Sequence, residues 1–368
     1  MGATRLPGID ALRGLAVLLV TGVHLWLAGA SWHRTTIGPL DVTPYFLFGS
    51  AGVSLFFVIS GFCLYHPLVG VKRPDWRRFY LRRALRILPP YLVAIAILFP
   101  LWGVGARWQG WLPALASHLG FVHSLSPVHF NTVSGPLWSL GTEVHYYLLF
   151  PLLALAIRRW PVPTLVLAAA SSVTIQALAG RGGFYSTDGL TAMRSVCWMC
   201  SLPARWVEFT AGMLAGVIVH QEQRVRPWLP LAWIVGLGGL VIAPLVHAHF
   251  QPAATLRTWW WGDILVAPCW AALVIAAGSS KRSLGWWQPL ATLGLISYSM
   301  YLYNLVFQWV VPAVFPALAP GTTWWWPASL LTTIACGGLG YLAVERPTMS
   351  WRARLRTSPK PSEPPLPS

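Results

Sequence analysis

The sequence predicts an all-α membrane protein, a polytopic helical bundle with about ten transmembrane helices and both termini in the cytoplasm. Three observations lead to this fold class. Hydrophobic residues make up 55% of the 368 residues, whereas charged residues make up only 10%. Apolar runs long enough to cross the roughly 30 Å of bilayer hydrocarbon recur along the whole chain. Basic residues gather in alternate loops, which is typical of the cytoplasmic side of a membrane protein.

Ten apolar runs give the predicted spans. They are residues 11–30, 46–66, 88–106, 137–157, 162–180, 205–220, 228–247, 261–278, 290–311 and 324–344. The first run is too long for a removable signal peptide, has no small-residue cleavage site after it and contains Arg13. We expect residues 1–350 to form one membrane domain. The proline-rich residues 351–368 are expected to form a disordered cytoplasmic tail.

The net charge of +16 would suggest a nucleic-acid partner for a soluble protein, but here its distribution describes topology. With the amino terminus in the cytoplasm, the inside loops hold the basic clusters at 72–86, 158–159, 224–226 and 281–282. The segments on the opposite side hold few arginines. The positive-inside rule therefore predicts a multi-pass protein of the cell membrane (the inner or plasma membrane), surrounded by membrane lipid and binding no nucleic acid.

Arg13 and His24 lie eleven residues apart on the first predicted span. Eleven residues of α-helix turn about 20° beyond three full turns and rise about 16 Å, so both side chains share one helix face. A charge and an imidazole within hydrocarbon are costly and usually face a protein interior or a water-filled path. The spacing alone also fits a snorkelling Arg13 and a hydrogen-bonded core His24. The other motifs of the chain favour a functional pair.

The most basic segment, residues 67–87, places Arg82, Arg83 and Arg86 just before the third span. Arg83 and Arg86 share a helix face at this spacing. Arginine forks suit bidentate contacts with phosphate, although contact with anionic lipid head groups is an equal alternative for any single arginine. Because these arginines lie on the same predicted membrane side as Arg13, the phosphate of a ligand is favoured.

Polar side chains also interrupt the second and fourth spans. In the second span, Ser60 and Gly61 permit the close approach of a neighbouring helix, and Ser60 is a candidate substrate contact. The fourth span opens with Trp138, another candidate substrate contact, and contains Glu143. An ionised carboxylate within the bilayer is costly, so Glu143 is expected to pair with an arginine, a histidine or a substrate hydroxyl. A purely structural ion pair is the alternative.

Three later spans add further candidates. In the sixth span, Arg205 and Glu208, at i and i+3, are expected to bridge one another at the outer surface. The ninth span carries Tyr298 and Asn304, whose hydroxyl and amide are candidates to line a polar cavity and contact substrate. The tenth span is expected to stop at the inner surface at the sequence Glu345-Arg-Pro, with a local charge pair.

Together these segments resemble the acyltransferase-3 family of integral membrane O-acyltransferases, over roughly residues 5–350. The resemblance is carried by the Arg13-x10-His24 spacing, Phe57-Val-Ile-Ser60-Gly61-Phe62, Arg83-Ala-Leu-Arg86-Ile-Leu-Pro89, Trp138-Ser-Leu-x2-Glu143-x2-Tyr-Tyr-Leu, Ser297-Tyr-Ser-x-Tyr-Leu and Glu345-Arg-Pro. Many members of the family have histidine where this chain has Asn304. No fused SGNH-type hydrolase domain is expected, so the protein is expected to perform the acceptor chemistry alone or with a partner.

The resemblance implies that an acetyl or other short acyl group moves from cytoplasmic acyl-CoA to a hydroxyl of a sugar, a cell-envelope glycan or a natural product such as a macrolide. It implies that Arg13 and His24 are essential and that Arg83 and Arg86, beside Arg82, lie on the CoA side. Neutral His24, about 16 Å deeper than Arg13, would act as general base. Glu143 would orient the imidazole or stabilise its protonated form. A covalent acyl-histidine is the alternative.

A polytopic transporter or flippase would use the same polar residues as a substrate path, and it is the alternative from another class. The chain has no detectable inverted repeat, which favours the enzyme. The expected partners are therefore acyl-CoA as donor substrate, a hydroxylated glycan or small-molecule acceptor, and membrane lipid. Five cysteines give no disulfide framework, and the isolated CxxC at Cys197 and Cys200 is too little for zinc, so no metal cofactor is expected.

Overall fold

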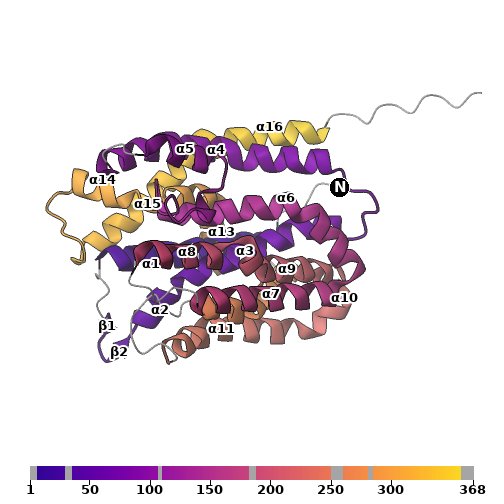
Figure 1. The fold of residues 1–368 in the computed structure, drawn as a ribbon. Coiled ribbons are helices and arrows are strands. Elements are labelled where there is room, and N and C mark those ends of the chain that lie inside the picture. Colours follow the sequence, from indigo (N-terminus) through magenta and orange to yellow (C-terminus); the bar gives the residue numbers. More distant parts are fainter. Residues whose placement is uncertain are drawn as a thin grey trace, which may run out of the picture.

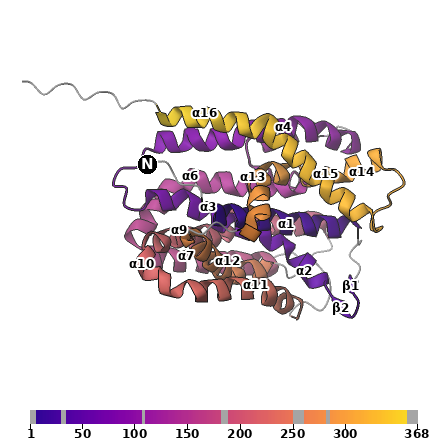
Figure 2. The ribbon, with the colours of Figure 1, turned by 180° about the vertical axis from the view of Figure 1, so that it is seen from behind.

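The protein is a bundle of long helices in the computed structural model, which describes residues 6–29, 35–106, 110–181, 188–249, 260–280 and 285–357 (Figures 1 and 2). Within these residues, the strands amount to one short antiparallel hairpin, β1 (Thr36–Ile37) and β2 (Leu40–Asp41). Several of the helices are long and apolar enough to span a bilayer. The predicted fold class, an all-α membrane bundle, is therefore confirmed.

Helices of very different length follow one another along the chain. In order they are α1 (Pro7–Gly29), α2 (Thr43–Leu47), α3 (Ala51–Tyr65), α4 (Trp76–Ala106), α5 (Trp111–Leu119), α6 (Trp138–Arg159), α7 (Pro161–Arg181), α8 (Gly189–Cys200), α9 (Leu202–His220), α10 (Glu222–Val225), α11 (Leu229–His249), α12 (Trp260–Ser279), α13 (Gln288–Leu302), α14 (Phe307–Val314), α15 (Trp325–Gly340) and α16 (Arg346–Thr357). Short 3₁₀ turns join them at η1 (Phe48–Ser50), η2 (His66–Leu68), η3 (His123–Leu125), η4 (Gly135–Leu137), η5 (Arg226–Trp228) and η7 (Gly285–Trp287).

Each predicted apolar run coincides with a helix, but the number of straight spans is smaller than expected. In the described part of the chain, 8 segments are long and apolar enough to cross a bilayer, or 9 if one bent pair is counted. That pair is α13 and α14, which meet at 90°. The break includes Asn304, a residue type that favours turns because its amide competes with the backbone for hydrogen bonds. The apolar part of α12, Leu265–Ser279, is shorter than a full span. The cytoplasmic position of both termini stays a prediction.

The tenth span does not stop at Glu345, so that expectation is wrong. A π-helical turn, η8 (Tyr341–Glu345), joins α15 directly to α16. Pro347 is compatible with this continuation because it lies in the first turn of α16, where a missing backbone N–H costs little. The helix therefore extends past the expected start of the tail at residue 351. The remaining tail, residues 358–368, lies outside the described residues.

Glycines allow the backbones of the central helices to approach one another closely. A Cβ on Gly61 of α3 would lie 2.0 Å from the carbonyl oxygen of Phe209 in α9, and a Cβ on Gly14 of α1 would lie 2.0 Å from that of Leu290 in α13. No other side chain fits at either position, because the neighbouring atoms belong to backbone. The predicted close approach of a helix at Ser60-Gly61 is therefore confirmed. These contacts bring α1, α3, α9 and α13 together around the polar residues of the interior.

Candidate active site

Two cavities lie side by side inside the bundle and contain most of the predicted site residues. The larger, of about 560 Å³, is formed mainly by α1, α3, α8, α9 and the loop before α6, and His24 lines it. The smaller, of about 70 Å³, is formed by α1, α3, α4, α6 and α13, and Arg13 and Arg86 line it. We call them the histidine cavity and the arginine cavity. Val53 and Tyr301 line both.

The arginine cavity brings together residues from four helices that are far apart in the sequence. Arg13 comes from α1, Ser60 from α3, Arg86 from α4 and Glu143 from α6. The Ser60 hydroxyl donates to Glu143 Oε1 at 2.8 Å, and the Tyr147 hydroxyl donates to the same oxygen at 2.5 Å. Hydrogen bonds to a charged acceptor are strong, so they hold the carboxylate in place. Glu143 is thus held by protein hydroxyls and acts on Arg13, Arg83 and Arg86 electrostatically, without a direct ion pair.

The positive charge of this cavity has no contact partner of opposite sign. Arg13 and Arg86 interact electrostatically, and neither forms an ion pair or a hydrogen bond with another residue in the described part of the chain. The Arg83 guanidinium lies over two aromatic rings, at 5.8 and 5.9 Å from their centres, which is a cation–π geometry. Arg82 and Arg83, both on α4, line neither cavity. An anionic ligand in this cavity would meet guanidinium groups whose donors are free.

Glu345 also belongs to this site, although the sequence suggested only a helix end there. Its side chain is buried and accepts a hydrogen bond from the Ser299 hydroxyl at 2.9 Å. Arg86 and Arg13 are its electrostatic partners, beyond direct contact distance. The signal that could have found it is an acid at the end of a long apolar run on the predicted arginine side of the membrane. The π-helical turn that places it is not readable from the pattern.

The two candidates of the ninth span have different surroundings. Tyr298 lines the arginine cavity, and its hydroxyl donates to the Ile87 carbonyl oxygen at 3.1 Å. Asn304 lines neither cavity. Its Nδ2 donates to the Thr21 hydroxyl at 2.9 Å, and its side chain interacts with His24. The amide is therefore used inside the protein, behind the histidine, and does not face a substrate space.

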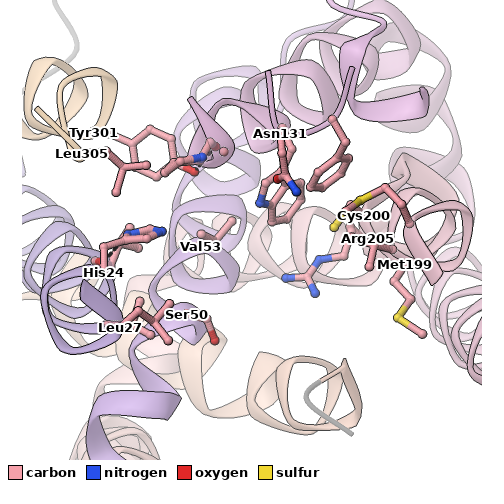
Figure 3. A pocket seen from close by; sticks show the side chains of 18 of the residues that line it. His24, Leu27, Ser50, Val53, Asn131, Met199, Cys200, Arg205, Tyr301 and Leu305 are labelled. Carbon is pink, nitrogen blue, oxygen red and sulfur yellow. Dashed lines mark hydrogen bonds between the residues drawn. The ribbon is translucent and has the colours of Figure 1, made fainter. Parts of the chain in front are cut away.

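His24 lines the histidine cavity (Figure 3), and its ring interacts with the Val20 carbonyl and with the side chain of Asn304. Its Nδ1 lies 2.8 Å from the carbonyl oxygen of Val20, one turn earlier on α1. A carbonyl oxygen only accepts, so in the neutral ring Nδ1 carries the proton and Nε2 carries the free electron pair. This tautomer is suited to take a proton from a hydroxyl group in the cavity.

The expected pairing of Glu143 with His24 is not formed. Glu143 lines only the arginine cavity and is bound by hydroxyls there, whereas His24 lines only the histidine cavity. The carbonyl of Val20 orients the imidazole instead. The expectation failed because helical periodicity reports which residues share a face of one helix, but not which face of another helix lies opposite.

A buried ion pair forms the wall across from His24. Figure 3 shows the imidazole and the guanidinium of Arg205 at opposite sides of the cavity. Arg205 Nη2 lies 2.8 Å from Glu208 Oε1, so the predicted i, i+3 bridge is confirmed. The two residues are only 4% and 0% exposed, so the bridge lies inside the bundle, and its position toward the outer side of the membrane stays a prediction. The guanidinium also lies over the rings of Phe57 and Trp138, at 5.7 and 5.9 Å, and Trp138 itself lines the cavity.

The loop between α5 and α6 closes part of the histidine cavity. It contributes Phe130, Asn131 and Pro136 to the lining. The rings of His118 and His123 stack at 4.0 Å, and their Nε2 atoms bond the carbonyl oxygens of Thr132 and Leu137 at 3.1 and 3.0 Å. Burial, with a contribution from His123, lowers the pKa of His118 to about 3, and burial lowers the pKa of His123 to about 4. Both rings are therefore neutral near pH 7 and hold the loop. No sequence pattern singled them out.

The fold and the two cavities define a multi-pass membrane protein with a buried polar site that offers free guanidiniums and a basic imidazole nitrogen. The chain belongs to the acyltransferase family Acyl_transf_3, whose model, described as an acyltransferase domain, matches residues 6–342. The resemblance seen in the sequence is thereby confirmed, and the protein is a membrane O-acyltransferase. Family membership favours the enzyme over the transporter alternative.

Characterised relatives are similar along most of the chain. Nodulation protein 10 of Rhizobium leguminosarum bv. viciae is 26% identical, with 94% of this chain and 94% of that protein aligned. Acyltransferase MdmB of Streptomyces mycarofaciens is 26% identical over 97% of this chain and 96% of the relative. Peptidoglycan O-acetyltransferase OatA of Listeria monocytogenes is 24% identical, and the match covers 81% of this chain but 48% of OatA. No solved structure matches the chain.

Proposed function

We propose that the protein transfers an acetyl or other short acyl group from cytoplasmic acyl-CoA to a hydroxyl group of a glycan or of a natural product such as a macrolide, in the cell membrane. One observation carries the proposal. Arg13 and His24, on one face of α1, line adjacent cavities, one with guanidiniums free of contact partners and one with a free imidazole nitrogen. The relatives suggest the acceptor classes, since OatA is named for peptidoglycan and ExoZ of Rhizobium meliloti for exopolysaccharide.

The donor would enter at the arginine cavity. Arg13 and Arg86 would bind phosphate groups of CoA through their guanidinium forks, and Arg83 and Arg82 would add positive charge on the same side. The pantetheine arm would then extend along the cavity toward Val53 and Tyr301. The rise of about 16 Å along α1 from Arg13 to His24 separates phosphate binding from proton transfer. The thioester would therefore meet the acceptor at the boundary of the two cavities.

The acceptor would lie in the histidine cavity with one hydroxyl directed at His24 Nε2. As the hydroxyl oxygen attacks the thioester carbonyl carbon, its proton passes to Nε2, which acts as general base. The carbon–sulfur bond then breaks, and CoA leaves as a thiolate. The proton on the imidazole passes to the sulfur, so the products are the acyl ester and CoA as a thiol. The Val20 carbonyl, which accepts from Nδ1, stabilises the imidazolium between these steps.

The proposal is tested with the purified full-length protein in detergent. We expect radiolabelled acetyl-CoA to be consumed, and free thiol and a labelled ester to form, only when a hydroxylated acceptor is present. Calorimetric titration with CoA should give binding that weakens as salt is added, because charge dominates it. A protein that neither binds CoA nor consumes acetyl-CoA with any glycan or macrolide acceptor would contradict the proposal. Solute movement by such a protein in proteoliposomes would instead support the transporter.

A further inference from the structure

Val53 and Tyr301 stand between the two cavities. They are the residues that line both, and their side chains are only 7% and 6% exposed. The arginines lie on the side of about 70 Å³, and His24 lies on the side of about 560 Å³. Because these two residues are common to both linings, the boundary between the arginines and His24 lies at their side chains, and we call this boundary the gap.

Tyr301 forms one side of this gap, and its hydrogen bonds restrict rotation of its side chain. Its hydroxyl donates to the Pro136 carbonyl oxygen at 2.7 Å and lies 2.6 Å from the Ser139 hydroxyl, so the ring is tied to the start of α6. The ring also packs edge-on against Phe56, with centroids 6.0 Å apart. Rotation of the tyrosine would leave buried polar groups without their hydrogen bonds, which costs about 1–3 kcal/mol for each.

Val53 is the other side of the gap, in the first turn of α3. The preceding Gly52 is pressed onto α1, where a Cβ would lie 2.5 Å from the carbonyl oxygen of Ala16. The backbone that carries Val53 therefore cannot move away from the gap toward α1. Valine is branched at Cβ, and a single χ1 rotamer dominates for it in a helix. Two methyl groups on a fixed backbone thus form this side.

We propose that Val53, set against Tyr301, determines the size of the acyl group that the enzyme accepts and restricts the donor to acetyl and other narrow acyl chains. The inference rests on the proposed function, because it takes acyl-CoA as the donor. The thioester carbonyl and its substituent must lie in the gap when the hydroxyl at His24 attacks. A branched group such as isobutyryl carries two methyl groups next to the carbonyl, so it collides with Val53 whichever way it points.

The test compares acetyl-CoA with isobutyryl-CoA in the full-length enzyme and two alanine variants. Val53→Ala widens the gap. Val58→Ala is the matched control, because Val58 lies on the same helix and is fully buried but lines neither cavity. We expect Val53→Ala to raise the ratio of kcat/KM for isobutyryl-CoA over acetyl-CoA by about tenfold or more, since one methylene in a pocket is worth about 10–200-fold. Val58→Ala should keep the ratio of the unchanged enzyme.

A second variant keeps the test decisive if Val53→Ala proves too unstable to purify. Val53→Ile narrows the gap, so it should lower acetyl transfer while the affinity for CoA without an acyl group stays unchanged. Equal ratios in Val53→Ala and Val58→Ala, full acetyl transfer by Val53→Ile, or equal use of both donors by the unchanged enzyme would each overturn the inference. The proposed function fails in a different way: the unchanged enzyme would then release no CoA from either thioester, and both proposals would fall.

Discussion

The arginine cavity and the histidine cavity share a wall, but their arginines differ in whether they contact a residue of opposite charge. In the arginine cavity, the guanidiniums of Arg13 and Arg86 have no contact partner in the described part of the chain. In the histidine cavity, Arg205 is paired with Glu208 and lies over two aromatic rings. A buried cation without a partner is costly, so it indicates a place for an anionic ligand, whereas a paired cation is part of a wall. Pairing therefore distinguishes the arginines that we propose to bind a ligand from the arginine of a structural ion pair, which residue type alone does not.

The two cavities also suit different substrates. Under the proposed function, phosphate groups of the donor would bind at the small cationic cavity, while an uncharged hydroxyl compound would occupy the larger one, whose lining is mostly apolar. The wall between them, Val53 and Tyr301, is where the two substrates would meet. Changes on either side should therefore affect different kinetic constants, and the following variants test that difference.

The largest effect is expected from His24→Ala. General-base assistance is typically worth about 10²–10⁴ in rate, so acyl transfer should fall by that factor while CoA binding on the other side of the wall is unchanged. Turnover with labelled acetyl-CoA and calorimetry with CoA measure the two quantities on the same purified sample. Full specific activity in a stable His24→Ala variant would end the general-base mechanism.

Arg205→Met tests whether Arg205 stabilises the fold through its ion pair or contacts the substrate. Removing one partner of a buried pair typically costs about 3–5 kcal/mol, so thermal unfolding in detergent should occur at a markedly lower temperature. The double variant Arg205→Met with Glu208→Leu removes both charges and should recover most of that stability. A stable Arg205→Met variant with a raised KM for the acceptor would instead make Arg205 a substrate contact.

Arg86→Ala should weaken CoA binding by about 10–100-fold, since a hydrogen bond to a charged group is worth about 1.5–3 kcal/mol. Arg86→Lys should restore only part of the affinity, because one ammonium cannot copy the guanidinium fork. Titration of CoA at low and high salt measures both effects, and Arg205 variants serve as the comparison from the other cavity. Unchanged CoA affinity in Arg86→Ala would contradict phosphate binding at this arginine.

The smallest effect is expected for one histidine ring and a change of one pH unit, through His118 or His123. In the unfolded chain a histidine binds its proton near pH 6.5, whereas burial lowers the pKa of these two to about 3 and about 4 in the folded protein. Between pH 6.5 and 4 the unfolded state therefore binds more protons, and folding stability falls as the pH is lowered, by about 1.4 kcal/mol per pH unit for each ring. His123→Gln should flatten the dependence of the unfolding temperature on pH. An equally steep dependence in that variant would show that other groups cause it.

Many residues that line the two cavities were predicted from the sequence. Arg13, Ser60, Arg86, Glu143 and Tyr298 line the arginine cavity. His24 and Trp138 line the histidine cavity. The signal was the cost of polar groups in hydrocarbon, which makes such residues rare unless they face a protein interior. The i, i+3 spacing identified Arg205 and Glu208 as a pair, but it did not predict that Arg205 lines a cavity inside the bundle.

The sequence by itself determined the helices and the face that Arg13 and His24 share, because hydrophobic runs and the 3.6-residue period are local properties of the chain. Only the tertiary structure decided which faces meet. It placed Glu143 beside Ser60 and Tyr147 instead of His24, and it placed Val53 and Tyr301 in the lining of both cavities. The physical reason is that helix rotation and register are set by backbone contacts between distant segments, such as those at Gly14 and Gly61. No pattern within one helix encodes its partner.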